Sequence, residues 1–261
     1  MGAPGTICLM YHEIELPGRE LADSDPGYTR YAVSLASFRE QMQFLKSAGR
    51  RGINVTQMLS STAGTGVALT FDDGCETDLI TAAPLLKDFG FQATFYITVG
   101  FLGKPGFMSR AQARELGESG FEIGCHSLTH PYLTDVDAAG LEMEIAGAKK
   151  QLEDILGRAV THYSCPGGRW SGRVAEVAKR AGYESVATSQ VGVNRPESDR
   201  FFLSRNAVTR DVGLADFQAL ASGTGLWSKQ LRNRTLQLVQ RTMGSAAYNR
   251  LRSAILGGTE H

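Results

Sequence analysis

Short apolar runs rich in β-forming residues alternate along the chain with longer segments in which apolar residues recur at helical spacing. This alternation is typical of βα units built around a mainly parallel sheet. The runs predict strands at Thr6–Met10, Val67–Phe71, Ala93–Thr98, Phe121–Cys125, His162–Cys165, Ser185–Thr188 and Phe202–Ala207. The segments between them predict helices at Leu35–Ala48, Glu76–Phe89, Gln112–Glu118, Ala138–Ile155, Val174–Ala181 and Ala215–Ala221. The order predicts an α/β fold, a distorted β/α barrel of about seven parallel strands.

Glycines and one polar pair mark the ends of these predicted helices. A glycine follows five of them where a left-handed C-cap is needed, at Gly49, Gly90, Gly120, Gly157 and Gly182. Ser109 and Gln112 have the spacing of a capping box at a helix start.

The composition of the chain changes after residue 222. From Gly223 onward basic residues recur among apolar ones at roughly helical spacing, and no acidic residue occurs before Glu260. We therefore expect a barrel domain over residues 1–222 and a basic amphipathic helical tail over residues 223–261. Such a tail can lie on an anionic membrane surface. It can equally pack across the barrel with its basic face in solvent.

The overall composition limits the classes of function. A chain of 261 residues with 42% hydrophobic content can bury one large core. Its 27 basic and 27 acidic residues balance, so no global field attracts nucleic acid, and we expect no nucleic-acid partner. The four cysteines lack a C-x-x-C spacing, which predicts reduced thiols. No signal-like segment opens the sequence, so we expect a cytoplasmic protein, with peripheral membrane contact only through the tail.

Two adjacent acidic residues, Asp72 and Asp73, directly follow the predicted strand Val67–Phe71. Barrel enzymes place their catalytic groups at this carboxyl end of a strand. Adjacent carboxylates there point in different directions, so one can bind a cation while its neighbour accepts a proton. Taken alone, Asp-Asp-Gly is also a common turn sequence.

A pair of histidines, in the segment His126-Ser-Leu-Thr-His130, follows the predicted strand Phe121–Cys125. On a helical turn, residues four apart share a face and can bind one metal ion. Taken alone, the pair could be ordinary surface or capping histidines. Because both polar clusters follow strands of the same predicted barrel, we expect them to meet at one end of it.

These motifs resemble those of a known family. Thr70-Phe-Asp-Asp73 and His126-Ser-Leu-Thr-His130 look like the first two motifs of the polysaccharide deacetylase family, also called the NodB-homology family or carbohydrate esterase family 4. Gly90-Phe-Gln-Ala-Thr-Phe-Tyr96 and Gly120-Phe-Glu-Ile-Gly124 resemble the strands around these motifs, and the resemblance extends from about Ile7 to Ala207. It implies a metal-dependent hydrolase that removes an acetyl or other acyl group from the amide nitrogen of a sugar or glycan.

The resemblance also implies roles for individual residues. Asp73, His126 and His130 would bind a divalent metal, typically Zn²⁺, and Asp72 would act as the general base. One carboxylate and two neutral imidazoles leave open positions for water and substrate, as a catalytic site requires. Gly167 would supply a backbone N–H to the oxyanion of the intermediate.

The third motif of the family, commonly Arg-x-Pro-x-Gly, is incomplete in this chain. Ser164-Cys-Pro-Gly-Gly168 occupies its place, with a serine where the family has the arginine that orients the general base. Arg169 is a candidate substitute, or it solvates the loop. Trp170 is expected either to stack against the sugar or to close the barrel.

The late histidine motif, which supplies the proton to the leaving amine in the family, is absent. Leu203-Ser-Arg-Asn206 lies in its place. Tyr11-His12 follows the first predicted strand and resembles the poly-N-acetylglucosamine deacetylase branch, so we expect His12 to be the general acid. The alternative is that His12 only lines the strand end. Arg205 is expected to contact substrate, or an acidic group that needs its charge neutralised.

Three functions remain open at this point. A carbohydrate N-deacetylase is favoured, and a deformylase of a lipid-linked amino sugar fits the same fold. The third is a catalytically impaired carbohydrate- or partner-binding module that has lost the motif arginine and the late histidine. Cys75, Cys125 and Cys165 lie beside motif residues, but we expect small buried thiols rather than a thiolate site.

Overall fold

The computed structural model describes residues 5–60, 65–224 and 226. In this part of the chain the main sheet has eight strands, all paired in parallel, in the order β10-β1-β5-β6-β7-β8-β9 with β4 beside β5. Their bounds are β1 Ile7–Tyr11, β4 Gly52–Ile53, β5 Val67–Phe71, β6 Thr94–Ile97, β7 Glu122–Cys125, β8 His162–Ser164, β9 Ser185–Ala187 and β10 Asn206–Ala207. A small second sheet pairs β2 (Ile14–Glu15) with β3 (Val33–Ser34). These results confirm the predicted distorted β/α barrel.

The segment after β9 brings the two edges of the main sheet together. Leu203 forms a parallel bridge with Ala187 of β9, and Asn206 pairs with Leu9 of β1. The predicted strand Phe202–Ala207 is therefore too long, because the chain crosses from one edge to the other within it. Only its last two residues form β10.

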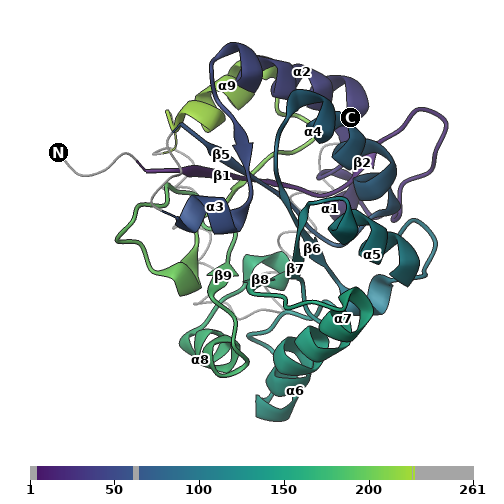
Figure 1. The fold of residues 1–261 in the computed structure, drawn as a ribbon, viewed down its shortest axis with the longest axis vertical. Coiled ribbons are helices and arrows are strands. Elements are labelled where there is room, and N and C mark those ends of the chain that lie inside the picture. The colour runs from purple at the N-terminus through teal and green to yellow at the C-terminus, as the bar shows by residue number, and fades with distance from the viewer. Residues whose placement is uncertain (1–4, 61–64, 225, 227–261) are drawn as a thin grey trace.

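Helices surround the strands (Figure 1). Their bounds are α1 Pro26–Thr29, α2 Leu35–Ser47, α3 Val55–Leu59, α4 Ala83–Phe89, α5 Arg110–Glu118, α6 Ala138–Glu142, α7 Ala148–Leu156, α8 Gly172–Arg180 and α9 Leu214–Ser222. The five predicted glycine caps all have positive φ, and Ser109 with Gln112 forms the predicted capping box. Two predicted helices contain π-helical turns, Asp78–Ala82 and Met143–Gly147, which a hydrophobic period does not distinguish from α-helix.

Helix α3 closes the end of the barrel at which the strands begin. The Glu122 carboxylate at the start of β7 accepts hydrogen bonds from the backbone N–H groups of Val55 (3.0 Å) and Thr56 (3.2 Å). The imidazole Nε2 of His162, at the start of β8, lies 2.8 Å from Thr56 Oγ1. The predicted site residues lie at the opposite, carboxyl end of the strands.

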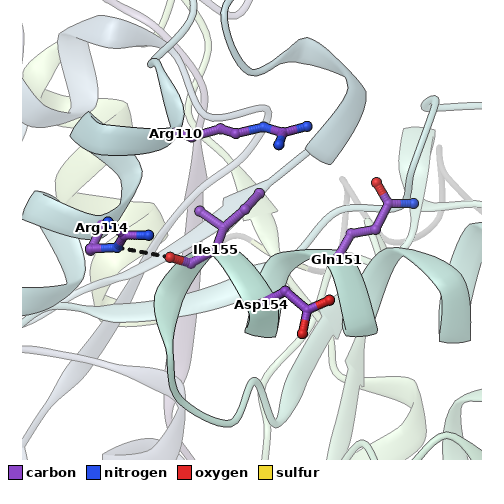
Figure 2. Close-up of a pocket in the computed structure, with 5 residues that line it drawn as sticks. All are labelled: Arg110, Arg114, Gln151, Asp154 and Ile155. Carbon is purple, nitrogen blue, oxygen red and sulfur yellow. Dashed lines mark hydrogen bonds between the residues drawn. The ribbon is translucent and has the colours of Figure 1, made fainter.

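A pocket on the outer surface lies between α5 and α7, apart from the predicted site residues. Figure 2 shows Arg110, Arg114, Gln151, Asp154 and Ile155 around it, with Arg114 Nε donating to the carbonyl oxygen of Ile155 at 2.9 Å. None of these five residues belongs to a motif discussed above.

The cysteines, the tail and the possible membrane contact were each the subject of a prediction from the sequence. All four cysteines are buried with free thiols, at Cys8, Cys75, Cys125 and Cys165. Apart from Gly223, Thr224 and Leu226, the predicted basic tail lies outside the described residues, so the domain boundary and the membrane contact stay predictions. No described helix is long and apolar enough to cross a bilayer.

Candidate active site

The two acidic residues after β5 diverge at the carboxyl end of the sheet. The Asp72 N–H donates to the carbonyl oxygen of Tyr11 at 3.0 Å, which extends the pairing of β5 with β1 by one residue. Asp73 then adopts a left-handed backbone with φ of 79°. Such conformations in non-glycine residues gather at functional sites, since the surrounding structure has to hold them. The turn directs the two carboxylates to different partners, as predicted.

The second carboxylate meets both histidines. Asp73 Oδ1 lies 3.5 Å from His126 Nε2 and 3.4 Å from His130 Nε2. Within the described residues this is the group of His, Cys, Asp and Glu side chains that could hold a metal ion, with its ligand atoms within 4.8 Å of one another. The predicted metal residues are thus brought together.

The donor atoms of this group fit a divalent metal. Asp73 Oδ1 is buried and, among the described residues, has no hydrogen-bond partner, although buried carboxylate oxygens normally have one. His126 Nδ1 lies 2.9 Å from the carbonyl oxygen of Ser164, so it carries the hydrogen and leaves the Nε2 lone pair facing Asp73. One oxygen and two nitrogens are a donor set that zinc sites use.

Protonation of the group agrees with metal binding. Burial lowers the pKa of His126 to about 3, despite the opposing charge of Asp72, and burial also lowers the pKa of His130. Both imidazoles are therefore neutral near pH 7, which is the form that binds metals. Burial raises the pKa of Asp73 to about 6, and a bound cation would reverse that shift.

The histidine segment is not the helical turn that the spacing of four residues suggested. Ser127 and His130 have left-handed backbones, with φ of 71° and 65°. The Ser127 hydroxyl accepts a hydrogen bond from the His130 N–H at 2.9 Å. The segment is an irregular loop, and its side-chain hydrogen bonds replace those of a helix.

The carboxylate of Asp72 is bound by the guanidinium of Arg205, which lies 133 residues later in the sequence. Arg205 Nη1 donates to Asp72 Oδ1 at 2.7 Å and Nη2 donates to Oδ2 at 2.8 Å. The remaining donor hydrogens of the guanidinium bind the Thr188 carbonyl (2.9 Å), the Ser164 hydroxyl (2.7 Å) and the Thr70 hydroxyl (3.3 Å). All five N–H donors of the guanidinium are therefore used within the protein.

The ion pair sets the charge of the carboxylate. Burial alone would raise the pKa of Asp72, but the Arg205 guanidinium outweighs it and holds the pKa well below its usual value. The same pairing raises the pKa of Arg205. Asp72 is consequently ionised throughout the neutral range, with its orientation fixed by a bidentate contact.

A family model described as polysaccharide deacetylase matches residues 60–186, which contain the acidic pair and the histidine loop. Residues 60–186 match the polysaccharide deacetylase family. It is 32% identical over 137 residues to a chitooligosaccharide deacetylase of Azorhizobium caulinodans, a match that covers 52% of this chain and 61% of that protein. It is 23% identical over 201 residues to a poly-β-1,6-N-acetyl-D-glucosamine N-deacetylase of Staphylococcus aureus, covering 70% and 69% of the two chains.

The solved structures extend this likeness to the fold. The Streptococcus pyogenes deacetylase PplD, solved in complex with acetate, superposes with a TM-score of 0.73 at 22% identity, covering 84% of this chain and 98% of the other. The chain spans about three-fifths of the length of the Azorhizobium relative. The deacetylase family is metal-dependent in general, and this chain has a group of residues able to hold a metal.

In this chain an arginine just before β10 takes the place of the motif arginine of the deacetylase family. Ser164 stands where the family arginine would be, and its small side chain leaves room for the guanidinium of Arg205. Arg205 thus fills the place for which Arg169 was one candidate, and the guanidinium carbon of Arg169 lies 3.9 Å from the ring centroid of Tyr132. Of the two contacts expected for Arg205, the structure shows the acidic group and leaves no N–H for a substrate.

His12 lies next to the acidic pair. It follows β1 directly, is half-buried, and its ring centroid lies 4.6 Å from that of Tyr31. Burial lowers the pKa of His12, and the charges of Asp73 and Asp72 oppose this shift. The position agrees with the predicted acid at the strand ends, although its role stays a prediction.

The third motif forms one side of the site. Gly167 has a φ of 59°, and a Cβ there would lie 2.6 Å from the Tyr132 ring, so both conformation and space require glycine. Trp170 Nε1 donates to the Phe201 carbonyl at 2.7 Å, and its ring packs edge-on against Phe202. These contacts show Trp170 fastening the segment that leads to Arg205, while its sugar stacking stays a prediction.

Proposed function

We propose that this chain is a metal-dependent hydrolase that removes an N-acetyl, or another N-acyl, group from an amino sugar in a polysaccharide, oligosaccharide or lipid-linked glycan. The observation that carries the proposal is the meeting of Asp73, His126 and His130 beside a separately held Asp72. The relatives support the substrate class, because their names specify N-acetylated chito-oligosaccharide and poly-N-acetylglucosamine.

Asp73, His126 and His130 would hold the metal, for which we propose Zn²⁺. Three protein ligands are the usual number in a catalytic zinc site, with further positions open. The ion would supply Lewis-acid polarisation of the amide carbonyl and acidify the attacking water.

Asp72 would take the proton from the attacking water as the general base. Asp72 Oδ2 accepts hydrogen bonds from both Arg205 and the Ser164 hydroxyl, whereas Oδ1 accepts one from Arg205 and keeps a second lone pair, so the bidentate contact orients the carboxylate and leaves Oδ1 able to take the proton. The Gly167 N–H would bind the developing oxyanion.

His12 would give a proton to the leaving amine. Amide cleavage needs such an acid because an unprotonated amine is a poor leaving group, and His12 is the described histidine outside the metal group that lies at this end of the barrel. The lowered pKa of His12 makes its protonated form a stronger acid.

The contact between Arg205 and Asp72 favours an enzyme over the catalytically impaired binding module. That alternative depended on two losses, the motif arginine and the late histidine. Arg205 supplies the guanidinium that Ser164 cannot, and it is wholly buried at the base, where a sugar-binding surface would have no use for it.

Acetate release from N-acetylated chito-oligosaccharides and poly-β-1,6-N-acetylglucosamine tests the proposal. The full chain loaded with Zn²⁺ is expected to release acetate, and a chelator is expected to abolish the release until Zn²⁺ is restored. Asp73→Ala and His126→Ala should both lose activity and metal. Asp154→Ala, an exposed aspartate on α7, is the matched control and should retain both. Absence of turnover by the metal-loaded wild type on every N-acylated sugar would reject the proposal.

A further inference from the structure

The loop that carries both metal-group histidines has a conformation that its own sequence does not favour. Two of its residues, Ser127 and His130, are left-handed without being glycine. Backbone of this kind persists only where neighbouring groups hold it. The Ser127 hydroxyl provides one such contact to the His130 N–H, but the two residues between them need partners too.

Those partners come from a single buried carboxylate. Glu144 Oε2 accepts hydrogen bonds from the backbone N–H groups of Leu128 (2.9 Å) and Thr129 (2.8 Å). Its other oxygen, Oε1, accepts from the Thr129 hydroxyl at 2.6 Å. Glu144 is only 6% exposed, so these bonds form away from competing water.

The helical stretch that carries Glu144 is irregular at this point. Glu144 lies in the π-helical turn Met143–Gly147, between α6 and α7. A π-helical turn inserts a residue into the helical register and changes the directions of the side chains around it, and such turns are frequent at functional sites. Here Glu144 is buried against the loop, whereas the preceding residues Glu142 and Met143 are exposed.

We propose that Glu144 is a positioning residue of the metal site, which fixes the loop of residues 126–130 so that His130 Nε2 stands beside Asp73 and His126. Its three accepted hydrogen bonds hold the middle of the loop, and the histidines stand at the two ends. The inference rests on the proposed metal centre, but it concerns a residue that contacts neither metal nor substrate. Changes in the partners of metal ligands commonly weaken metal binding by about 10- to 100-fold.

Binding of Co²⁺ alone to the full chain tests this role without any substrate. Glu144→Ala is expected to bind Co²⁺ about 10- to 100-fold more weakly than wild type and to change the visible absorption of the bound ion, since the ligand geometry changes. Glu144→Gln should recover most of the affinity. Its amide oxygen can accept the two backbone N–H groups, and its NH₂ can donate to the Thr129 hydroxyl.

Glu142→Ala is the matched control, because Glu142 is exposed on the same helical stretch and pairs with Arg180. It should bind Co²⁺ as wild type does. If Glu144→Ala does not fold by circular dichroism, Glu144→Asp replaces it: the charge remains while the oxygens retreat by one methylene, and about 10-fold weaker binding is expected.

The outcomes separate this inference from the proposed function. A folded Glu144→Ala or Glu144→Asp variant with wild-type Co²⁺ affinity and absorption would overturn the positioning role alone. A wild-type chain that binds no Co²⁺ would instead reject the metal centre itself.

Discussion

Arg205 holds both carboxylate oxygens of Asp72, at 2.7 Å and 2.8 Å, although 133 positions separate the two residues in the sequence. The contact is buried and bidentate, so it fixes both the charge and the direction of the proposed base. The chain lacks the motif arginine of the deacetylase family and yet has an arginine at its proposed base, supplied from another part of the sequence.

Replacing Arg205 by lysine should separate the effect of its positive charge from the effect of its bidentate hydrogen-bond geometry. Lysine keeps the positive charge, but one ammonium cannot reproduce the planar fork that binds both oxygens of Asp72. Misplacement of a reacting group by about 1 Å costs on the order of 100-fold, so we expect kcat to fall by about that factor with KM little changed. Steady-state kinetics on an acetylated chito-oligosaccharide measures both. Arg114→Lys, on α5, is the control, and equal kcat in the two variants would contradict the assigned role of Arg205.

Loss of His12 should matter only where the leaving group needs a proton. His12→Ala is expected to lower kcat on an N-acetylated sugar by about 10²- to 10⁴-fold, the usual contribution of a general acid. On 4-nitrophenyl acetate, whose phenolate leaves without protonation, the variant should match wild type. A parallel loss on both substrates would show that His12 supports the site in another way.

The ion pair predicts a specific loss of stability in acid. The folded pKa of Asp72 lies below its unfolded value of about 3.9, so the pair's contribution is fully present above that pH and is lost as the pH falls towards the folded pKa. Each pH unit in this window removes up to about 1.4 kcal/mol. Urea unfolding of the metal-free chain between pH 5 and 2 should therefore show a steeper decline for wild type than for Asp72→Asn/Arg205→Met. Parallel declines would show that Asp72 has no lowered pKa.

The cysteines should be inert in the folded chain. Burial raises the pKa of Cys8, Cys125 and Cys165 to about 12, and that of Cys75 is also well above its usual value. Because the thiolate is the reactive form, a disulfide reagent at pH 8 is expected to label no thiol in the native protein and all four in denaturant. Rapid labelling of native protein would contradict this burial.

The sequence predicts the parts of the site that are local. Asp72, Asp73 and the histidine pair each follow a strand directly, so recognising the strands was enough to place all four at one end of a parallel barrel. The prediction that the histidine pair lies on a helical turn was wrong, because backbone N–H groups of the loop donate hydrogen bonds to the side chains of Glu144 and Ser127.

The sequence alone did not identify Arg205 as the partner of Asp72. Arg169 was one candidate because it is near the third motif, yet nearness in sequence does not decide which cation reaches a carboxylate in the barrel. That depends on where the chain crosses from β9 to β1, and Leu203 and Asn206 mark the crossing only once their pairing is known. The available signal was an arginine within the predicted strand Phe202–Ala207, together with the missing motif arginine.

The segment that crosses from β9 to β1 also affects when the site is completed as the protein is synthesised. Asp72 leaves the ribosome 133 residues before Arg205 does, and until then no guanidinium reaches it. A carboxylate without a counter-charge resists enclosure in an apolar interior. The site is therefore complete only once the last strand has been made, and a nascent chain that ends before residue 205 holds every proposed metal ligand but lacks the arginine that orients the proposed base.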